Sequence, residues 1–223
     1  MRYDVEETRR RLKEAGAQQF AERGFNGASL DDIAAQARVN KQRIYAHFGN
    51  KQQFFAAILA EELATLAATV TLTSLSAEGV GDFAGRTYDY HVRHPVLGRL
   101  LIWEGLTFGD AGVPDESARR AYYQEKVRAF ATAQKDGVFD ADLDAAHLIF
   151  AITALAAWWV AVPQMARMLE EFDPPDAVGP DHSRRRAAVV RAAVRLALPR
   201  EDWPQTTPQP RKRRDIRATT RRS

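Results

Sequence analysis

A short polar run, Lys41-Gln42-Arg43, carries side chains that could recognise a base edge or a phosphate. Arginine can donate two hydrogen bonds to guanine O6 and N7, and glutamine matches adenine N6 and N7, each pair giving roughly 1–3 kcal/mol of discrimination. Other donors nearby suit phosphate oxygens, and such contacts set the register of a protein on the duplex. These phosphate candidates are Lys41, Tyr45, His47 and Lys51.

Residues 29–48 predict the two helices that would position these side chains. Ser29 can cap the first helix, and acidic residues in its first turn suit the helix dipole. Asn40 can cap a second helix that starts at Lys41. Two short helices joined by about three residues are the geometry of a helix-turn-helix.

The spacing of the apolar residues supports this motif. Ala34 is small where the two helices would cross, Val39 fills the turn, and Ile44 lies ten residues after Ala34 at the centre of the second helix. With these residues facing the core, Lys41, Gln42, Arg43 and His47 face outward. A solvated polar helix face without DNA contacts is the alternative interpretation of the same positions.

A wider set of residues extends the pattern on both sides of the motif. It comprises Phe20, Gly24, Phe25, Ser29, Ile33, Ala34, Ala37, Val39, Ile44, Tyr45, His47, Phe48 and Lys51. With these residues, the first 60 or so positions resemble the DNA-binding domain of the tetracycline-repressor (TetR) family. The resemblance implies that Ser29, Lys41, Tyr45, His47 and Lys51 contact the DNA backbone, and that Gln42 and Arg43 read bases.

Three positions depart from the family pattern. Arg38 stands where glycine is usual at a left-handed turn, which costs about 1 kcal/mol for a residue with a Cβ. Asn40 replaces the commoner serine or threonine but caps equally well. Arg43 is larger than the residues usual at its position, so we expect an unusual operator.

The rest of the chain reads as helices, with alanine-rich segments and no convincing run of alternating β-branched residues. The sequence therefore predicts an all-α protein. We divide it into a three-helix DNA-binding domain at 1–51, a larger helical domain at 52–198 and a basic tail at 199–223, which its composition predicts to be disordered. Residues 145–162 approach membrane-spanning length, but a buried core or interface helix is the favoured interpretation, and no membrane partner is expected.

For the larger domain, the resemblance implies a small effector and dimerisation through the last two helices, here residues 144–168 and 184–198. A two-fold pair would bury the apolar surface of the first of these helices and place two recognition helices about 34 Å apart. The expected interface residues are Ile149, Ile152, Trp158, Trp159, Val190 and Val194.

Aromatic residues with polar tips suggest walls for an effector cavity, although an ordinary core position is the favoured interpretation for each one taken singly. They are Tyr88, His91, Trp103, Phe108, Tyr122, Tyr123, Phe130 and Phe150. His91 and His94 could share one helical face as metal ligands, but no third ligand is evident. No metal site and no cofactor are predicted.

Composition narrows the function further. The chain lacks cysteine, which excludes disulfides and thiolate catalysis, and it begins without an apolar signal segment, so we expect a cytoplasmic protein. No phosphate-binding glycine loop, nucleophile elbow or metalloprotease motif is present, so an enzyme is not expected. The net charge is unevenly distributed, at +3 in residues 1–51, −10 in 52–183 and +10 in 184–223. This distribution suggests that different segments meet different partners.

With these patterns, the family resemblance implies a homodimeric, effector-responsive regulator, most simply a repressor, that binds a palindromic operator in double-stranded DNA. The alternative is a non-specific architectural DNA-binding protein that uses the basic run from Arg211 as its main contact through counterion release. A helical acid–base hydrolase is a third class, but nothing in the sequence supports it.

Overall fold

The structure, a computed structural model, describes residues 2–109, 112–113, 116–170 and 180–199. Helices fill these ranges and no strand occurs in them, so the all-α prediction is confirmed. The helices are α1 (Arg2–Gly27), α2 (Leu30–Gln36), α3 (Gln42–Phe48), α4 (Lys51–Thr69), α5 (Ala77–Arg93), α6 (Pro95–Phe108), α7 (Glu116–Lys135), α8 (Ala145–Ala161), α9 (Pro163–Glu170) and α10 (Pro180–Ala197). The basic run of the predicted tail lies outside the described residues.

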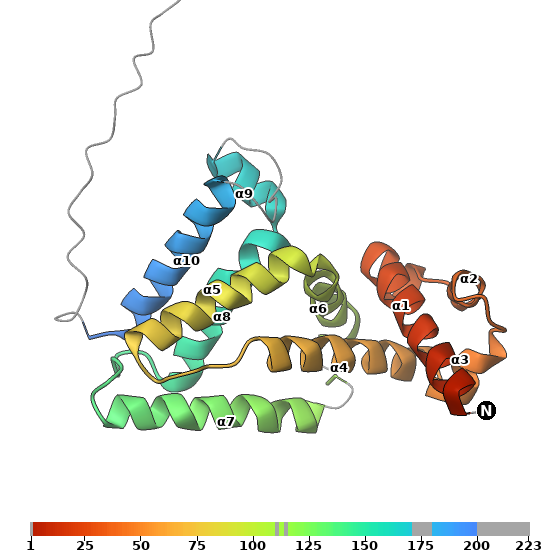
Figure 1. Cartoon of the computed structure of the whole chain (residues 1–223), viewed down its shortest axis with the longest axis horizontal. Coiled ribbons are helices and arrows are strands. Elements are labelled where there is room, and N and C mark those ends of the chain that lie inside the picture. The colour runs from red at the N-terminus through yellow and green to blue at the C-terminus, as the bar shows by residue number, and fades with distance from the viewer. Residues whose placement is uncertain (1, 110–111, 114–115, 171–179, 200–223) are drawn as a thin grey trace, which may run out of the picture.

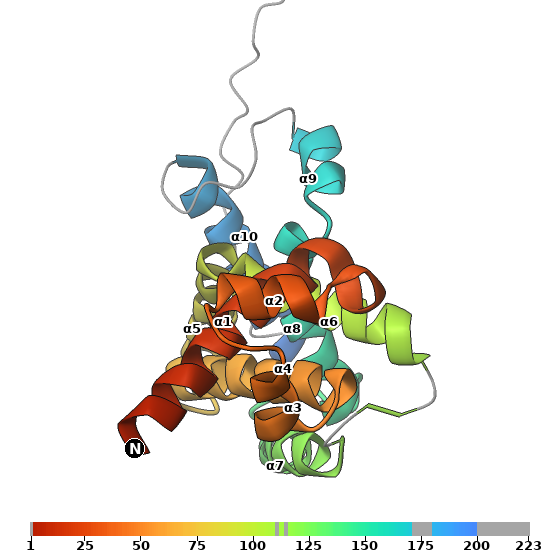
Figure 2. The same cartoon turned by 90° about the vertical axis from the view of Figure 1, so that its right-hand side faces the viewer.

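Helices α1, α2 and α3 form one end of the molecule, and α5 to α10 form the other (Figure 1). Helix α4 runs from the first end into the second, with α7 alongside it. Figure 2 looks onto the first end, where α2 and α3 lie toward the viewer. We call α1–α3 with the start of α4 the head, and α5–α10 with the rest of α4 the body.

An aromatic cluster forms the core of the head. The ring of Phe20 packs edge-on against Phe54 and Phe55 of α4, with centroids 5.8 and 5.1 Å away, and all three side chains are fully buried. Asn50 and Gln53 form a capping box at the start of α4. The capping box therefore determines where α4 begins, and Phe54 and Phe55 determine which side of α4 packs against α1.

A break in α1 lets α6 approach the head. Gly24 has φ of 73°, in the left-handed region, so α1 is kinked there, three residues before its end at Gly27. A Cβ at Gly24 would lie 2.7 Å from the ring of Trp103, and Trp103 Nε1 donates a hydrogen bond to the Ala21 carbonyl at 3.4 Å. Trp103 therefore joins body to head, and its expected place in a cavity wall is wrong.

Helix α10 packs mainly along α5 within the same subunit. Gly81 and Gly85 of α5 lack a Cβ, so Val190 and Val194 come within about 3 Å of where that atom would be. This places both valines against α5, a different setting from the subunit interface expected for them. The outward positions of α10 carry arginines, including Arg191.

The long apolar segment is broken at Val162. Helices α8 and α9 meet there at 86°, so the single helix expected over 144–168 is wrong. No single helix in the described ranges is long and apolar enough to cross a membrane. Ile152 is fully buried inside the subunit, so it belongs to the core and has no surface left for a second subunit.

Candidate nucleic-acid interface and ligand cavity

Helix α3 buries its apolar residues and exposes Gln42 and Arg43 as the sequence predicted, whereas His47, expected to face outward, is half-buried with its Nε2 buried. Ile44 and Phe48 are buried against the head, and Ala34 of α2 is buried opposite Ile44. Gln42 and Arg43 are exposed on the opposite side. The packing therefore presents both expected base-reading side chains to solvent in the first turn of the helix.

The turn between α2 and α3 has the hydrogen bonds of a Schellman motif. The Val39 N–H donates to the Ala34 carbonyl at 3.0 Å, and the Arg38 N–H donates to the Ala35 carbonyl at 3.0 Å. Arg38 has φ of 55°, the one positive value of a non-glycine residue in the described ranges. The left-handed turn expected at Arg38 is therefore present.

Arg11 of α1 braces this turn from the side. Its guanidinium donates hydrogen bonds to the carbonyls of Ala37 and Arg38, the second at 3.1 Å. Sequence reasoning missed this contact, because residues 26 or 27 positions apart share no local spacing. Arg11 thereby fixes the angle at which the chain enters α3.

Two further contacts orient the start of α3. The Asn40 side chain accepts a hydrogen bond from the Gln42 N–H at 2.9 Å, whereas α3 begins at Gln42, one residue later than expected, so its N-cap position is Lys41. Lys41 lies 2.9 Å from Asp31 of α2, and the hydrogen bond to this carboxylate raises the pKa of Lys41. The side chains of Lys41 and Asp31 are both exposed, so this ion pair orients Lys41 more than it stabilises the fold.

The remaining candidate phosphate contacts have different settings. Tyr45 is 47% exposed on α3. Ser29 is half-buried and caps α2 by accepting from the Asp32 N–H, and His47 Nε2 is buried without a hydrogen-bond partner among the described residues. Lys51 Nζ lies 5.1 Å from the centre of the Phe25 ring, and burial lowers the pKa of Lys51. All seven candidates lie on α2, α3, their caps or the start of α4.

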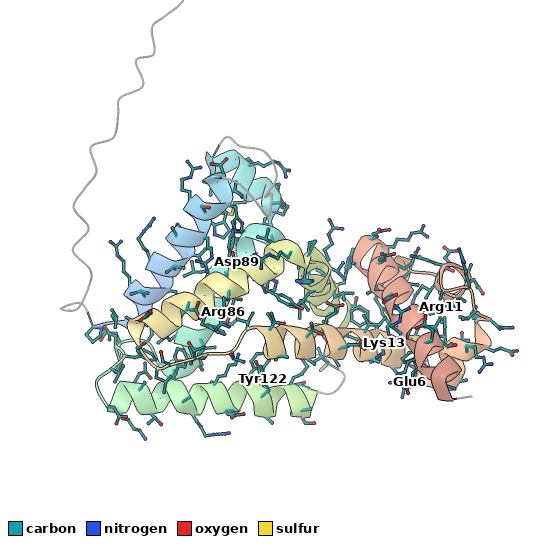
Figure 3. The ribbon with its side chains drawn as sticks, viewed as in Figure 1. Glu6, Arg11, Lys13, Arg86, Asp89 and Tyr122 are labelled. Atoms are coloured by element: carbon teal, nitrogen blue, oxygen red, sulfur yellow. The ribbon has the colours of Figure 1, made fainter. Side chains whose placement is uncertain are left out.

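The body contains a cavity of about 530 Å³ between α4, α5, α7 and α8, within the usual range for small-molecule sites. Tyr122 lies on the side of α7 that faces α4 (Figure 3). The walls are mostly apolar. They are formed by Ala60, Leu63, Ala64, Leu66, Ala67, Val70, Phe83, Thr87, Ala118, Arg119, Tyr122, Tyr123, Lys126, Ile149 and Thr153.

Two cations of α7 border this cavity. Arg119 Nη1 donates to both carboxylate oxygens of Glu104 on α6, at 2.8 and 2.9 Å. Lys126 Nζ lies 4.9 Å from the centre of the Phe83 ring and 4.6 Å from that of Tyr122. Sequence reasoning missed both cations, although Arg119, Tyr122 and Lys126 share the spacing of one helix face.

Of the residues expected in the cavity, only Tyr122 and Tyr123 line it. Ile149, expected at an interface, also lines it. The other candidates lie elsewhere because aromatic type alone does not give direction. Phe108 packs on Phe25 and Phe55, Phe130 packs on Phe139, Tyr88 is buried against His182, His91 is buried beside Tyr90, and Phe150 is 75% exposed.

No group of three or more possible metal ligands occurs among the described residues. Burial, with a smaller effect of the neighbouring His94, lowers the pKa of His91 to about 4. The ring of His94 stacks on Tyr90 at 4.3 Å between centroids. The two histidines therefore have separate structural settings.

An exposed apolar surface follows α8 and α9. Trp158 is 56% exposed, Met168 76% and Leu169 68%, and Phe150 lies two helical turns before Trp158 on α8. Trp159 is half-buried, with the Arg185 guanidinium 5.9 Å above its ring. Several large apolar side chains left exposed on two successive helices favour a protein–protein contact at these helices. We call Phe150, Trp158, Met165, Met168 and Leu169 the α8–α9 face.

Two family models match the chain, one over most of the head and the other over most of the body. One, described as bacterial regulatory proteins of the tetR family, matches residues 12–58. The other, the tetracyclin repressor-like C-terminal domain, matches residues 79–195. The first spans the helix-turn-helix, and the second spans α7, α8 and most of the cavity wall.

Named relatives agree with the models. The HTH-type transcriptional repressor SCO4008 of Streptomyces coelicolor is 44% identical over 166 residues, which are 74% of this chain and 85% of the relative. The structure of transcriptional regulator SCO4942 from the same species has a TM-score of 0.71 at 28% identity, covering 85% of this chain and 98% of that one. The structure of AibR in complex with isovaleryl coenzyme A and operator DNA shares the fold, with a TM-score of 0.62 at 18% identity over 83% of this chain and 97% of that one. The chain therefore belongs to the tetracycline-repressor family of DNA-binding transcriptional regulators.

Proposed function

We propose that the protein is a homodimeric repressor that reads a palindromic operator through α3 and leaves it when a small effector fills the cavity between α4 and α7. The observation that carries the proposal is the packing of α3, whose buried Ile44 directs Gln42 and Arg43 to solvent. Gln42 and Arg43 read bases, and Ser29, Lys41, Tyr45, His47 and Lys51 contact phosphates. The protein acts by binding rather than by catalysis, as expected for a family of regulators.

The domain division follows from the same packing. We propose the boundaries expected from the sequence, a DNA-binding domain at 1–51 and an effector-binding and dimerisation domain at 52–198, with the start of α4 also packing into the head through Phe54 and Phe55. Dimerisation uses the α8–α9 face, with Trp158 near its centre. A two-fold axis through this face would set two α3 helices one helical turn of DNA apart. A cytoplasmic location follows, since an operator must be within reach of the protein.

A chain of contacts supports coupling between cavity and head. Arg119 lines the cavity and binds Glu104 of α6. Trp103, the residue before Glu104, lies against Gly24 of α1. An effector that favours a different position of α6 would therefore shift the head away from its DNA-binding arrangement. Such coupling is reciprocal and typically amounts to about 1–3 kcal/mol per ligand.

Selection of bound sequences from random duplex DNA tests whether the protein binds DNA sequence-specifically. An enriched inverted repeat is expected for the wild type, and Arg43→Ala should relax preference at one base pair in each half-site, by about 1–3 kcal/mol. Lys135→Ala, a change at an exposed α7 lysine far along the chain from α3, is the matched charge control. A pool that stays random in sequence would instead support architectural binding.

A further inference from the structure

The cavity has one cation whose charge no neighbouring acid balances in the described part of the chain. Of its two cations, Arg119 is balanced by Glu104, which is buried behind it. Lys126 forms no ion pair with any described residue, and its ammonium faces the rings of Phe83 and Tyr122. No carboxylate is among the lining residues. A ligand in this cavity therefore meets an excess of one positive charge.

The other polar groups of the wall offer little to a strongly polar ligand. The Thr87 hydroxyl already donates to the Phe83 carbonyl at 2.7 Å. Helix α4 contributes only alanine and leucine side chains, Val70 follows at its end, and α8 contributes Ile149 and Thr153. The hydroxyls of Thr153, Tyr122 and Tyr123 are too few for a polyhydroxylated ligand, which would leave most of its own hydroxyls unpaired at a cost that disfavours it. The body of a matching ligand is therefore a hydrocarbon.

The position of Lys126 decides the sign of the ligand charge. Aromatic faces bind cations, but Lys126 already occupies those of Phe83 and Tyr122. A cationic ligand would have to displace this ammonium and would be repelled by it. A carboxylate can instead accept a charge-assisted hydrogen bond from the same group without disturbing the rings.

We infer that the effector is an amphiphilic monocarboxylate, with its carboxylate bound by Lys126 and its hydrocarbon body between α4 and α8. The inference rests on the proposed effector function of the cavity and names the chemical class of the ligand. It assigns Lys126 as the residue that distinguishes an acid from the corresponding alcohol.

Calorimetric titration of the full-length protein with three ten-carbon probes tests this inference without DNA. Decanoate is expected to bind at least about ten-fold more tightly than decanol or decyltrimethylammonium, each below its micelle concentration. Lys126→Gln should weaken decanoate about 10- to 100-fold and change decanol less than about three-fold, since it removes only the charged contact. Lys126→Arg should keep most of the affinity, and Lys135→Gln, at an exposed lysine of the same helix that does not line the cavity, should change nothing.

Two results would overturn the inference: decanoate that binds Lys126→Gln as well as wild type, or decyltrimethylammonium that binds wild type as tightly as decanoate. A second measurement, the release of the selected operator by the same three probes, distinguishes failure of the proposed ligand class from failure of the proposed repressor function. Release by the cation alone would keep the effector-responsive repressor and reject the anionic class. Loss of sequence-specific DNA binding in the absence of any probe would reject the repressor whatever the cavity binds.

Discussion

Arg119 of α7 holds both carboxylate oxygens of Glu104 on α6 through one nitrogen, at 2.8 and 2.9 Å. The carboxylate side chain is 7% exposed and the guanidinium side chain 22%. Arg119 belongs to the cavity wall, and Glu104 belongs to α6, the helix that contacts the head. This pair lies where an effector could change the position of α6.

Replacing Glu104 with Gln tests this role. The variant removes the charge that balances Arg119 in a mostly buried site, so we expect the free energy of unfolding to fall by about 2 kcal/mol, less than for a fully buried pair because Arg119 is partly exposed. Effector-induced operator release should weaken more than operator binding itself. Chemical denaturation and operator titrations with and without effector measure the two effects. A Glu104→Gln, Arg119→Met double variant should recover part of the lost stability. If the double variant loses as much stability as Glu104→Gln alone, the two residues are not a coupled pair.

The left-handed Arg38 predicts a stabilising substitution. Arg38→Gly should raise the free energy of unfolding by about 0.5–1 kcal/mol, because glycine has no Cβ to strain at φ of 55°, offset in part by its greater unfolded-state entropy. Arg38→Ala keeps the Cβ and should bring no such gain. Thermal denaturation of the three proteins gives the answer. An equal gain in both variants would assign the effect to the arginine charge instead of the backbone.

Burial of His91 predicts acid sensitivity. Its pKa is lowered from 6.5 to about 4 in the folded state, so the unfolded chain binds more protons between these values and stability falls as the pH falls. The loss from this residue is about 2 kcal/mol between pH 7 and pH 5. His91→Gln removes the titrating group and should flatten that part of the pH profile, even if it lowers stability throughout. A variant profile parallel to that of the wild type would show that other groups cause the acid sensitivity.

The α8–α9 face predicts a subunit contact. Trp158→Glu places a charge on a surface that is apolar and exposed in the single subunit, so dimers should dissociate and operator affinity should fall with them. Leu106→Glu is the matched control, because Leu106 is 71% exposed on α6, outside this face. Sedimentation velocity distinguishes the species. A dimeric Trp158→Glu protein would place the subunit contact elsewhere.

The local features of the head could be predicted from the sequence because each depends on residues close together in the chain. Ser29 caps α2, the Asn40 side chain accepts from the Gln42 N–H at the start of α3, Arg38 takes the left-handed turn, and Ala34 and Ile44 are buried. Each follows from spacing within about ten residues. The one-residue error at the start of α3 is of the size expected for helix ends.

The body could be predicted only as a set of helices. Which side of each helix faces the cavity depends on packing between distant segments, so Trp103 and Phe108 proved to contact the head, and Val190 lies on the glycines of α5. Ile152 is in the core while Phe150, two residues earlier, is exposed. Aromatic type was a poor guide, whereas the common face of Arg119, Tyr122 and Lys126 on α7 would have been a better one.

Helix α7 contributes every charged side chain of the cavity wall, whereas α4 contributes only apolar residues and also closes the core of the head. The two walls therefore differ in how freely they can change during evolution. A substitution among the α4 cavity residues, which begin at Ala60, changes a helix that packs into the head through Phe54 and Phe55 less than two turns earlier. One at Tyr122 or Lys126 alters the cavity alone, so related regulators can acquire new effectors through α7 while keeping the same operator.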